Sequence, residues 1–399
     1  MIFDKFIPVL IRPQYSRDSL SGIIFGVYLT LTAPFIAVIA RRLGASTFLI
    51  SLIISAPFIG QLFSLLWAEL MKNSRKMTFV FWTGILCRGL FILMAFVTDP
   101  ITYTVIIILQ NLIFSGHIPA YAEIIKRIYP EEYRGRAMGY VRIEAQLSVL
   151  ILSILAGKLL DLYGYRFIFP IGGLFGVLST ILFCSIKVDE QLNNQTDTNK
   201  KLVFNKNYIL FLVLLGLCDL GNLISQPIYP IFMVDKLNMN NFQVSILTFF
   251  QAGLALLGYN YWGYFVDKKN IIKGILTVIL FFSIIPLIYL VVNLFKLNFL
   301  FLLPSAILMG FAVSGFELLV FNGIFRFAPS ELLPSYFALR FVVVGITGII
   351  GPYFGSILME KLGINYVFII SVLFILTSFI LVSKYFLTTN KFGISSIET

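Results

Sequence analysis

The stretch Pro130–Phe169 reads PEEYRGRAMGYVRIEAQLSVLILSILAGKLLDLYGYRFIF, and Pro329–Phe368 reads PSELLPSYFALRFVVVGITGIIGPYFGSILMEKLGINYVF. Each stretch leads from a loop rich in Pro and Glu into an apolar run that contains one early arginine. Each then passes a glycine and an acidic residue and reaches a Gly-x-x-aromatic start of the next apolar run. The same order of landmarks in two distant places indicates an internal duplication.

A constant spacing relates the two copies. Three pairs of residues are separated by the same 198 positions: Arg142 and Arg340, Gly157 and Gly355, Glu69 and Asp267. A repeat of this length is far longer than a solenoid unit, so each half should be a helical bundle in its own right.

The composition places the chain in a membrane. Apolar residues make up 59% of the sequence and charged residues 12%, whereas charged residues reach roughly 25% in soluble domains. A soluble chain of 399 residues could not bury so many apolar side chains. The net charge of +11 comes from basic residues spread along short loops, which argues against a nucleic-acid partner.

Apolar segments long enough to cross a bilayer recur along the chain. A span needs about 20 helical residues, and twelve segments meet this length: Leu20–Ala40, Phe48–Leu70, Met77–Val97, Ile101–Ile125, Ala137–Leu160, Phe167–Ile186, Ile209–Val234, Val244–Val266, Ile271–Val292, Leu300–Phe325, Phe337–Met359 and Val367–Leu387. The ten-residue alternation typical of barrel strands is absent from the sequence. We predict an all-α integral membrane protein with twelve transmembrane helices in two pseudo-symmetric six-helix bundles, at 1–187 and 207–399, joined by a cytoplasmic linker at 188–206.

The distribution of basic residues predicts the orientation. With the N-terminus inside, the cytoplasmic segments carry twenty Lys and Arg and the opposite side carries seven. This excess places both termini in the cytoplasm of a multi-pass protein of the cytoplasmic membrane. The first apolar run has full length and starts after about 19 polar and mixed residues, so we expect no cleaved signal peptide.

Residues for enzymatic chemistry are scarce. The sequence has one histidine, no Gly-x-Ser-x-Gly motif and no phosphate-binding Gly-rich Lys-Ser/Thr loop. Its three cysteines (Cys87, Cys184 and Cys218) have no metal-ligand spacing. We therefore predict no catalytic residues, no metal and no cofactor, and we keep a membrane-embedded or lipid-processing enzyme only as an alternative.

The loop after the second helix of each half carries a family resemblance. Gly263-Tyr-Phe-Val-Asp267-Lys268-Lys269, followed by Lys273, resembles the Gly-x-x-x-Asp-Arg/Lys motif of the major facilitator superfamily, and the resemblance covers essentially the whole chain. The first-half copy departs from the motif, with Leu65 in place of glycine and Glu69 in place of aspartate. The resemblance implies a latch that holds one conformer, for which the candidates are Glu69, Arg75, Lys76, Gly263, Asp267, Lys268, Lys273, Arg134 and Arg136. The alternative is a loop whose positive charge only sets the topology.

Two other family signatures are incomplete. The Gly-Pro pair typical of antiporters is absent from the fifth helix, and the fourth helix lacks its usual arginine, with Gln110 and Asn111 as the nearest polar residues. These departures argue against proton-antiport drug export without excluding it.

Polar residues inside the expected spans are the candidates for binding and coupling. Such groups are costly in a bilayer, and in the resembled fold the first, fourth, seventh and tenth helices line the central cavity. Asp219, Asn222 and Gln226 share one face of the seventh helix, with Asp219 near mid-membrane. We predict that Asp219 responds to protons or another cation; the alternative is a structural carboxylate.

The fourth and tenth helices supply a second set of candidates. Gln110, His117 and Tyr121 share a face of the fourth helix. Glu317 in the tenth helix occupies nearly the position of His117 in the repeat, so the two are candidates for an inner gate or a coupling pair. For His117 the alternative is a packing role.

Four other charged residues within the spans each need an interaction partner or a route to the interface. Arg88 is mid-helix and needs a partner that the sequence does not identify. We expect Arg142 and Arg340 to reach the membrane interface with their long side chains, and Glu144 to form a structural ion pair.

Together these features predict a secondary transporter that works by alternating access. The first helix has few hydrophilic residues, which favours a small apolar or amphipathic solute, with coupling to protons or another cation and a slight preference for efflux. A nutrient uptake permease of the same fold is the alternative. We expect a monomer in the lipid bilayer.

Overall fold

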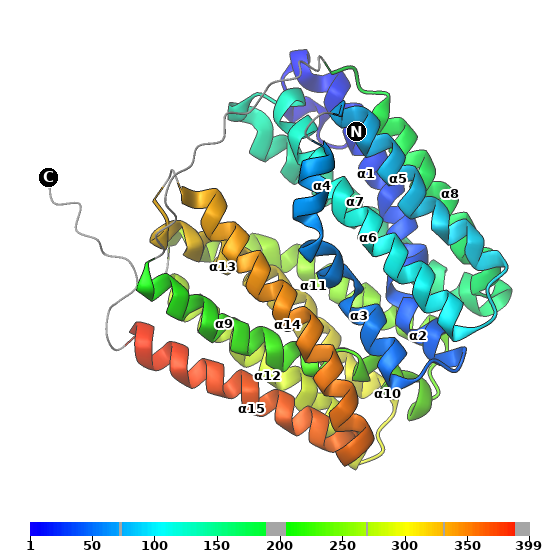
Figure 1. The fold of residues 1–399 in the computed structure, drawn as a ribbon, viewed down its shortest axis with the longest axis vertical. Coiled ribbons are helices and arrows are strands. Elements are labelled where there is room, and N and C mark those ends of the chain that lie inside the picture. Colours follow the sequence, from blue (N-terminus) through cyan, green and yellow to red (C-terminus); the bar gives the residue numbers. More distant parts are fainter. Residues whose placement is uncertain (72–73, 189–204, 269, 330–331, 388–399) are drawn as a thin grey trace, which may run out of the picture. The chain divides into compact units, whose positions relative to one another are not determined.

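The computed structural model describes residues 1–71, 74–188, 205–268, 270–329 and 332–387, and every regular element in these ranges is a helix (Figure 1). The predicted linker at 188–206 falls almost wholly on residues outside these ranges. The chain divides into two compact units, one comprising Met1–Thr196 with Asn238–Phe249 and the other Asp197–Leu237 with Phe250–Thr399.

The helices of the first half are the following: α1 (Arg12–Thr32), α2 (Ile36–Arg42), α3 (Thr47–Leu62), α4 (Ser64–Met71), α5 (Lys76–Gly89), α6 (Pro100–Ile128), α7 (Glu131–Tyr163) and α8 (Tyr165–Cys184). Four short 3-10 turns accompany them: η1 (Asp4–Phe6), η2 (Val9–Ile11), η3 (Ala33–Phe35) and η4 (Leu90–Ala95). Side-chain caps begin two of the helices, because Ser46 accepts a hydrogen bond from the Leu49 amide before α3 and Asp99 accepts one from the Thr102 amide before α6.

The helices of the second half are α9 (Lys206–Ser225), α10 (Ile228–Asp235), α11 (Asn241–Lys268), α12 (Ile271–Leu294), α13 (Leu303–Phe327), α14 (Leu333–Leu362) and α15 (Ile364–Val382), with a 3-10 turn η5 (Phe299–Leu302) and a π-helical turn η7 (Ser383–Leu387). Gly164 after α7 and Gly363 after α14 have φ angles of 74° and 91°. This left-handed conformation suits glycine, and the two helix ends are 199 residues apart, within one residue of the repeat spacing.

Eleven helical stretches in the described residues are long and apolar enough to cross a membrane. The second predicted span, Phe48–Leu70, is not among them, because it is divided at Phe63 into α3 and α4, of which α3 (Thr47–Leu62) is a shorter apolar helix. The first span is longer than predicted and runs from Val9 to Arg42. The all-helical membrane fold with two six-helix halves is therefore confirmed.

The two halves pack their helices in the same order. In the first half α1 packs on α7 and α8, and α5 packs on α6 and α8. In the second half α9 packs on α14 and α15, and α12 packs on α13 and α15. The 198-residue offset of the sequence thus corresponds to a repeated set of helix contacts.

A tryptophan–glycine contact occurs once in each half. The indole nitrogen of Trp67 in α4 donates to the Leu112 carbonyl oxygen of α6 at 3.0 Å, and the ring lies against Gly116. The indole nitrogen of Trp262 in α11 donates to the Phe311 carbonyl oxygen of α13 at 2.9 Å, and that ring lies against Gly315. Glycine makes room for each ring at the helix contact.

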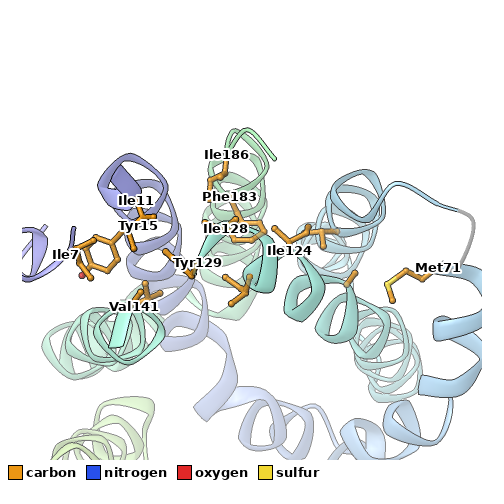
Figure 2. Close-up of a cluster of buried hydrophobic side chains, with 14 residues drawn as sticks. Ile7, Ile11, Tyr15, Met71, Ile124, Ile128, Tyr129, Val141, Phe183 and Ile186 are labelled. Atoms are coloured by element: carbon orange, nitrogen blue, oxygen red, sulfur yellow. The ribbon is translucent and has the colours of Figure 1, made fainter. Parts of the chain in front are cut away.

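One end of the first half is closed by a buried apolar cluster (Figure 2). Its side chains come from the N-terminal segment and from several helices of this half, and those labelled in the figure are Ile7, Ile11, Tyr15, Met71, Ile124, Ile128, Tyr129, Val141, Phe183 and Ile186. The segment before α1 is held here by a stack of Phe3 on Tyr140, with ring centroids 4.4 Å apart. Two members of the cluster, Tyr15 and Tyr129, donate hydrogen bonds to buried carboxylates that are described below.

The first turns of α11 belong to the first unit. The two carboxylate oxygens of Asp161 in α7 accept hydrogen bonds from the amides of Asn241 and Phe242 at 2.8 and 2.9 Å. An acidic group at this position satisfies free amides at the helix N-terminus and complements its dipole. Arg42 donates to the Asn241 side chain and to the Met239 carbonyl, both at 2.6 Å.

Candidate functional site

The second unit contains a buried ion pair between two of its helices. Asp219 lies in α9 and Arg340 in α14, and the arginine Nη1 is 2.5 Å from the aspartate Oδ2, with Nη2 3.3 Å from Oδ1. The side chains are 12% and 9% exposed, respectively. The expectation that Arg340 reaches the membrane interface is therefore wrong, because a two-pronged contact with a carboxylate holds it inside the bundle.

Two side-chain amides follow Asp219: Asn222 lies in α9, and Gln226 is the first residue after this helix. Asn222 and Gln226 are both half-buried. The side-chain oxygen of Asn222 is buried and accepts no hydrogen bond from any residue in the described ranges. An unsatisfied buried acceptor costs free energy, so this oxygen is available to a donor that approaches α9 beside the ion pair.

Glu317 is exposed in α13 and accepts a hydrogen bond from the Tyr259 hydroxyl of α11 at 2.6 Å. His117 lies in the other unit, in α6, and is 7% exposed. Its Nδ1 is 3.5 Å from the Thr83 hydroxyl of α5, and its ring stacks on Tyr121 with centroids 6.3 Å apart. Each of the two candidates for the gate pair thus has polar neighbours within its own unit.

Gln110 and Asn111 are adjacent in α6 and bind one another. The Asn111 amide nitrogen donates to the Gln110 side-chain oxygen at 3.0 Å and to the Ile107 carbonyl at 2.9 Å. Gln110 is 8% exposed. These amides satisfy part of each other's hydrogen-bonding capacity inside the bundle.

Asp18 in α1 is a buried carboxylate that the sequence analysis did not select. It is 2% exposed and accepts hydrogen bonds from the hydroxyls of Tyr129 at 2.8 Å and Tyr121 at 3.4 Å. Burial, together with the nearby carboxylate, raises the pKa of Tyr129, so its hydroxyl remains a proton donor at neutral pH. Among the described residues no cation pairs with Asp18.

Glu144 in α7 is also buried, with an exposure of 2%. It accepts hydrogen bonds from the Ile2 amide at 2.7 Å, the Tyr15 hydroxyl at 3.1 Å and the Ser19 hydroxyl. No basic side chain in the described part of the chain pairs with it. The expected ion pair is therefore replaced by hydrogen bonds, which satisfy a carboxylate equally directly.

Arg88 in α5 is 6% exposed, and its partners lie in α8 and α1. Nη1 donates to the Gly176 carbonyl at 3.1 Å, to the Ser179 hydroxyl at 3.4 Å and to the Thr180 hydroxyl. The guanidinium carbon lies 4.6 Å from the centre of the Phe25 ring, a cation–π arrangement.

The candidate latch residues are described only in part. Arg134 donates to the Tyr129 and Lys126 carbonyls at 3.3 and 3.2 Å, and Lys76 donates to the Met71 carbonyl at 2.5 Å. Four of the others are exposed, namely Glu69, Arg75, Arg136 and Lys273, and Gly263 is half-buried. Asp267 and Lys268 lie at the end of α11, with side chains outside the described residues.

Known proteins resemble this chain, in sequence or in fold, over nearly its full length. The chain is 25% identical over 378 residues, covering 88% of it, to the multi-drug resistance efflux pump PmrA of Streptococcus pneumoniae serotype 4, of which 92% is matched. Its fold is similar to that of a bacterial homolog of the human lysosomal transporter Spinster, with a TM-score of 0.70, 14% identity and coverage of 94% and 97%. It is likewise similar to the nucleoside transporter NupG, with a TM-score of 0.68, 14% identity and coverage of 94% and 98%.

The family model described as Major Facilitator Superfamily matches residues 19–221 and again residues 210–395, once for each half of the chain. The duplicated six-helix architecture agrees with this double match. The chain belongs to the major facilitator superfamily, a family of membrane transporters.

Proposed function

We propose that this transporter exports a small apolar or amphipathic solute across the cytoplasmic membrane by alternating access, with coupling to protons. The observation that carries the proposal is the ion pair between Asp219 of α9 and Arg340 of α14. It is the kind of group that a proton can switch, since one bound proton removes the charge that holds the two helices together.

The burial of the pair sets the size of the effect that a bound proton would have. Removing one charge of a buried ion pair destabilises the arrangement by about 3–5 kcal/mol, because the other charge is left without a partner. Protonation of Asp219 would similarly leave the Arg340 guanidinium without its anionic partner. The guanidinium would then need another hydrogen-bond acceptor. Asn222, with its free side-chain oxygen one turn along α9, offers one.

The proposed direction of transport, export, is based on a relative whose sequence matches most of this chain. The curated protein that aligns over 88% of this chain is a multi-drug efflux pump, and its name supports export here. The middle of the first helix, residues 22–31, has only Tyr28 and Thr30 as polar side chains, which supports an apolar or amphipathic solute. We also place both termini in the cytoplasm, because Lys and Arg are more numerous in the segments assigned to that side.

The test is solute flux in vesicles that contain the purified protein, driven by an imposed pH gradient. The Asp219→Asn variant is expected to insert and fold but to lose gradient-driven flux. Glu123→Gln is the matched control, because Glu123 pairs with Lys126 on the surface at 3.1 Å and its loss should leave flux unchanged. Flux of Asp219→Asn at the wild-type rate would remove Asp219 from the coupling role.

A further inference from the structure

Arg88 is a buried positive charge that has no buried negative partner among the residues that the structure describes. Arginine remains protonated in proteins, and this side chain is 6% exposed. The titratable side chains around it are Tyr28, Cys87, Cys184, Tyr121 and His117, and none of them is a carboxylate. No carboxylate of the described residues forms an ion pair with it.

The hydrogen bonds of Arg88 leave part of the guanidinium unused. Its three acceptors, the Gly176 carbonyl and the Ser179 and Thr180 hydroxyls, all lie on α8 and accept from the same nitrogen, Nη1. The Nε atom is buried and donates to no acceptor in the described part of the chain. A guanidinium presents its donors as a fork that fits the two oxygens of a carboxylate or phosphate, so the free side of Arg88 has the geometry of an anion-binding group.

The side chain is also held in place. A Cβ atom on Gly176 would lie 3.0–3.1 Å from the Arg88 stem, so the stem packs directly against the backbone of α8. On the other side the half-buried Phe25 ring of α1 covers the guanidinium. A ligand that displaces this ring finds a fixed positive charge next to an aromatic surface.

The depth of Arg88 favours a solute over a lipid head group. It is twelve residues after Lys76, where α5 begins, which is about 18 Å along the helix at about 1.5 Å per residue. The hydrocarbon core is about 30 Å thick, so Arg88 lies near its middle. The head group of an anionic lipid would have to leave the interface to reach it.

We propose that Arg88 binds the anionic group of the transported solute, which is an amphipathic molecule with a carboxylate or phosphate and an aromatic or aliphatic body. The body packs against Phe25 while the charge meets the guanidinium. This inference rests on the proposed function and specifies its substrate class as anionic amphiphiles.

The test is equilibrium binding to the purified full chain in phosphatidylcholine nanodiscs, without any gradient. Three probes share one ring system and differ in charge: 2-naphthoate, the uncharged 2-naphthamide and the cationic 2-naphthylmethylammonium. The wild type is expected to bind 2-naphthoate at least about tenfold more tightly than the other two, a ratio worth about 1.4 kcal/mol. Equal binding of the three, or no binding of 2-naphthoate, overturns the proposal.

Three variants test whether Arg88 causes the preference for the carboxylate probe. Arg88→Gln keeps donors but removes the charge, and it is expected to abolish the preference for the carboxylate. Arg166→Gln is the control, because Arg166 is an exposed residue that donates to the Ala95 carbonyl, and it should keep the preference. Retained preference in Arg88→Gln overturns the proposal. Should that variant not fold, Arg88→Lys decides: it is expected to keep the preference, and equal binding of the probes by folded Arg88→Lys overturns the proposal.

A second binding experiment distinguishes an anionic solute from the head group of an anionic lipid as the ligand of Arg88. Nanodiscs that contain phosphatidylglycerol should bind 2-naphthoate as phosphatidylcholine nanodiscs do. Loss of 2-naphthoate binding on addition of phosphatidylglycerol would assign the site to a lipid head group and overturn its assignment to the solute. Gradient-driven flux of an uncharged or cationic solute, with no binding of 2-naphthoate, would refute this inference alone and leave the proposed function standing.

Discussion

Asp219 and Arg340 are 121 residues apart in the chain, yet the aspartate Oδ2 lies 2.5 Å from the arginine Nη1. The guanidinium carbon is also 5.7 Å from the centre of the Phe316 ring of α13. One arginine of α14 thereby contacts side chains of two other helices of the second unit. A change of charge at this point acts on three helices together.

The ion pair should show strong energetic coupling. Arg340→Gln leaves the Asp219 carboxylate unpaired and is expected to destabilise the protein by about 3–5 kcal/mol. The double variant Asp219→Asn, Arg340→Gln should lose less than the sum of the two single variants, because neither charge is then left alone. Thermal unfolding in detergent measures the stability of the wild type, the two single variants and the double variant. Additive losses would contradict the coupling, and Lys126→Gln at the exposed surface pair is the control.

The two tyrosines that bind Asp18 should differ in their contribution. Tyr129→Phe removes the donor at 2.8 Å and is expected to cost about 1.5–3 kcal/mol, the usual range for a hydrogen bond to a charged group. Tyr121→Phe removes the donor at 3.4 Å and should cost less. Thermal unfolding compares them with Tyr163→Phe, whose side chain is 60% exposed. A larger loss for Tyr121→Phe would contradict this order.

Two glycines of α7 should respond oppositely to alanine. A Cβ atom on Gly157 would lie 2.6 Å from the Asn241 carbonyl oxygen, so Gly157→Ala must move the first turn of α11 and should cost about 1–3 kcal/mol. A Cβ atom on Gly139 would meet no atom of the described residues within 4 Å. Gly139→Ala should be neutral or stabilise by up to about 1 kcal/mol through helix propensity. Equal thermal stability of the two variants would contradict the close packing at Gly157.

The cap of α6 should depend on pH. The Asp99 carboxylate accepts hydrogen bonds from the Thr102 and Ile101 amides, and these lower its pKa below the ordinary value of 3.8. A lowered pKa stabilises the folded state at pH values above 3.8, and this contribution disappears as the pH falls through the folded-state pKa. Asp99→Ala should therefore reduce thermal stability at pH 7 and have a smaller effect below pH 3. A deficit that does not change with pH would contradict this cap.

The orientation can be tested with single cysteines in a background without the native three. Positions 158 and 361 are assigned to the external side, and positions 126 and 273 to the cytoplasmic side, by the count of basic residues. A membrane-impermeant thiol reagent added to intact cells should label Lys158→Cys and Lys361→Cys only. Labelling of Lys126→Cys or Lys273→Cys in intact cells would contradict the predicted orientation and place these positions outside.

The architecture could be predicted because it follows from periodic features of the sequence. Length and apolarity determine the spans, and the repeat relates positions that later prove to have equivalent contacts. Gly60 and Gly258, for example, keep the 198-residue spacing, and each lies against the fourth helix of its own half. These signals depend on many residues at once, so single exceptions do not remove them.

The buried polar contacts could be predicted far less well. Asp18 was missed because the first span was placed from Leu20, whereas the helical stretch begins at Val9; a search for acidic residues just outside span ends would have found it. The partners of Arg88 are a carbonyl and two hydroxyls of α8, and nothing in the sequence distinguishes these from many others. Side-chain pairing depends on helix rotation, which hydropathy alone does not determine.

The repeated tryptophan–glycine contacts give each half an optical reporter of its own. Of the three tryptophans, Trp67 belongs to the first unit and Trp262 to the second, while the third, Trp82, is 57% exposed. After Trp82→Phe, replacing either remaining tryptophan would leave fluorescence from a single half. The movements of the two bundles during a transport cycle could then be recorded separately in the same protein without any attached dye.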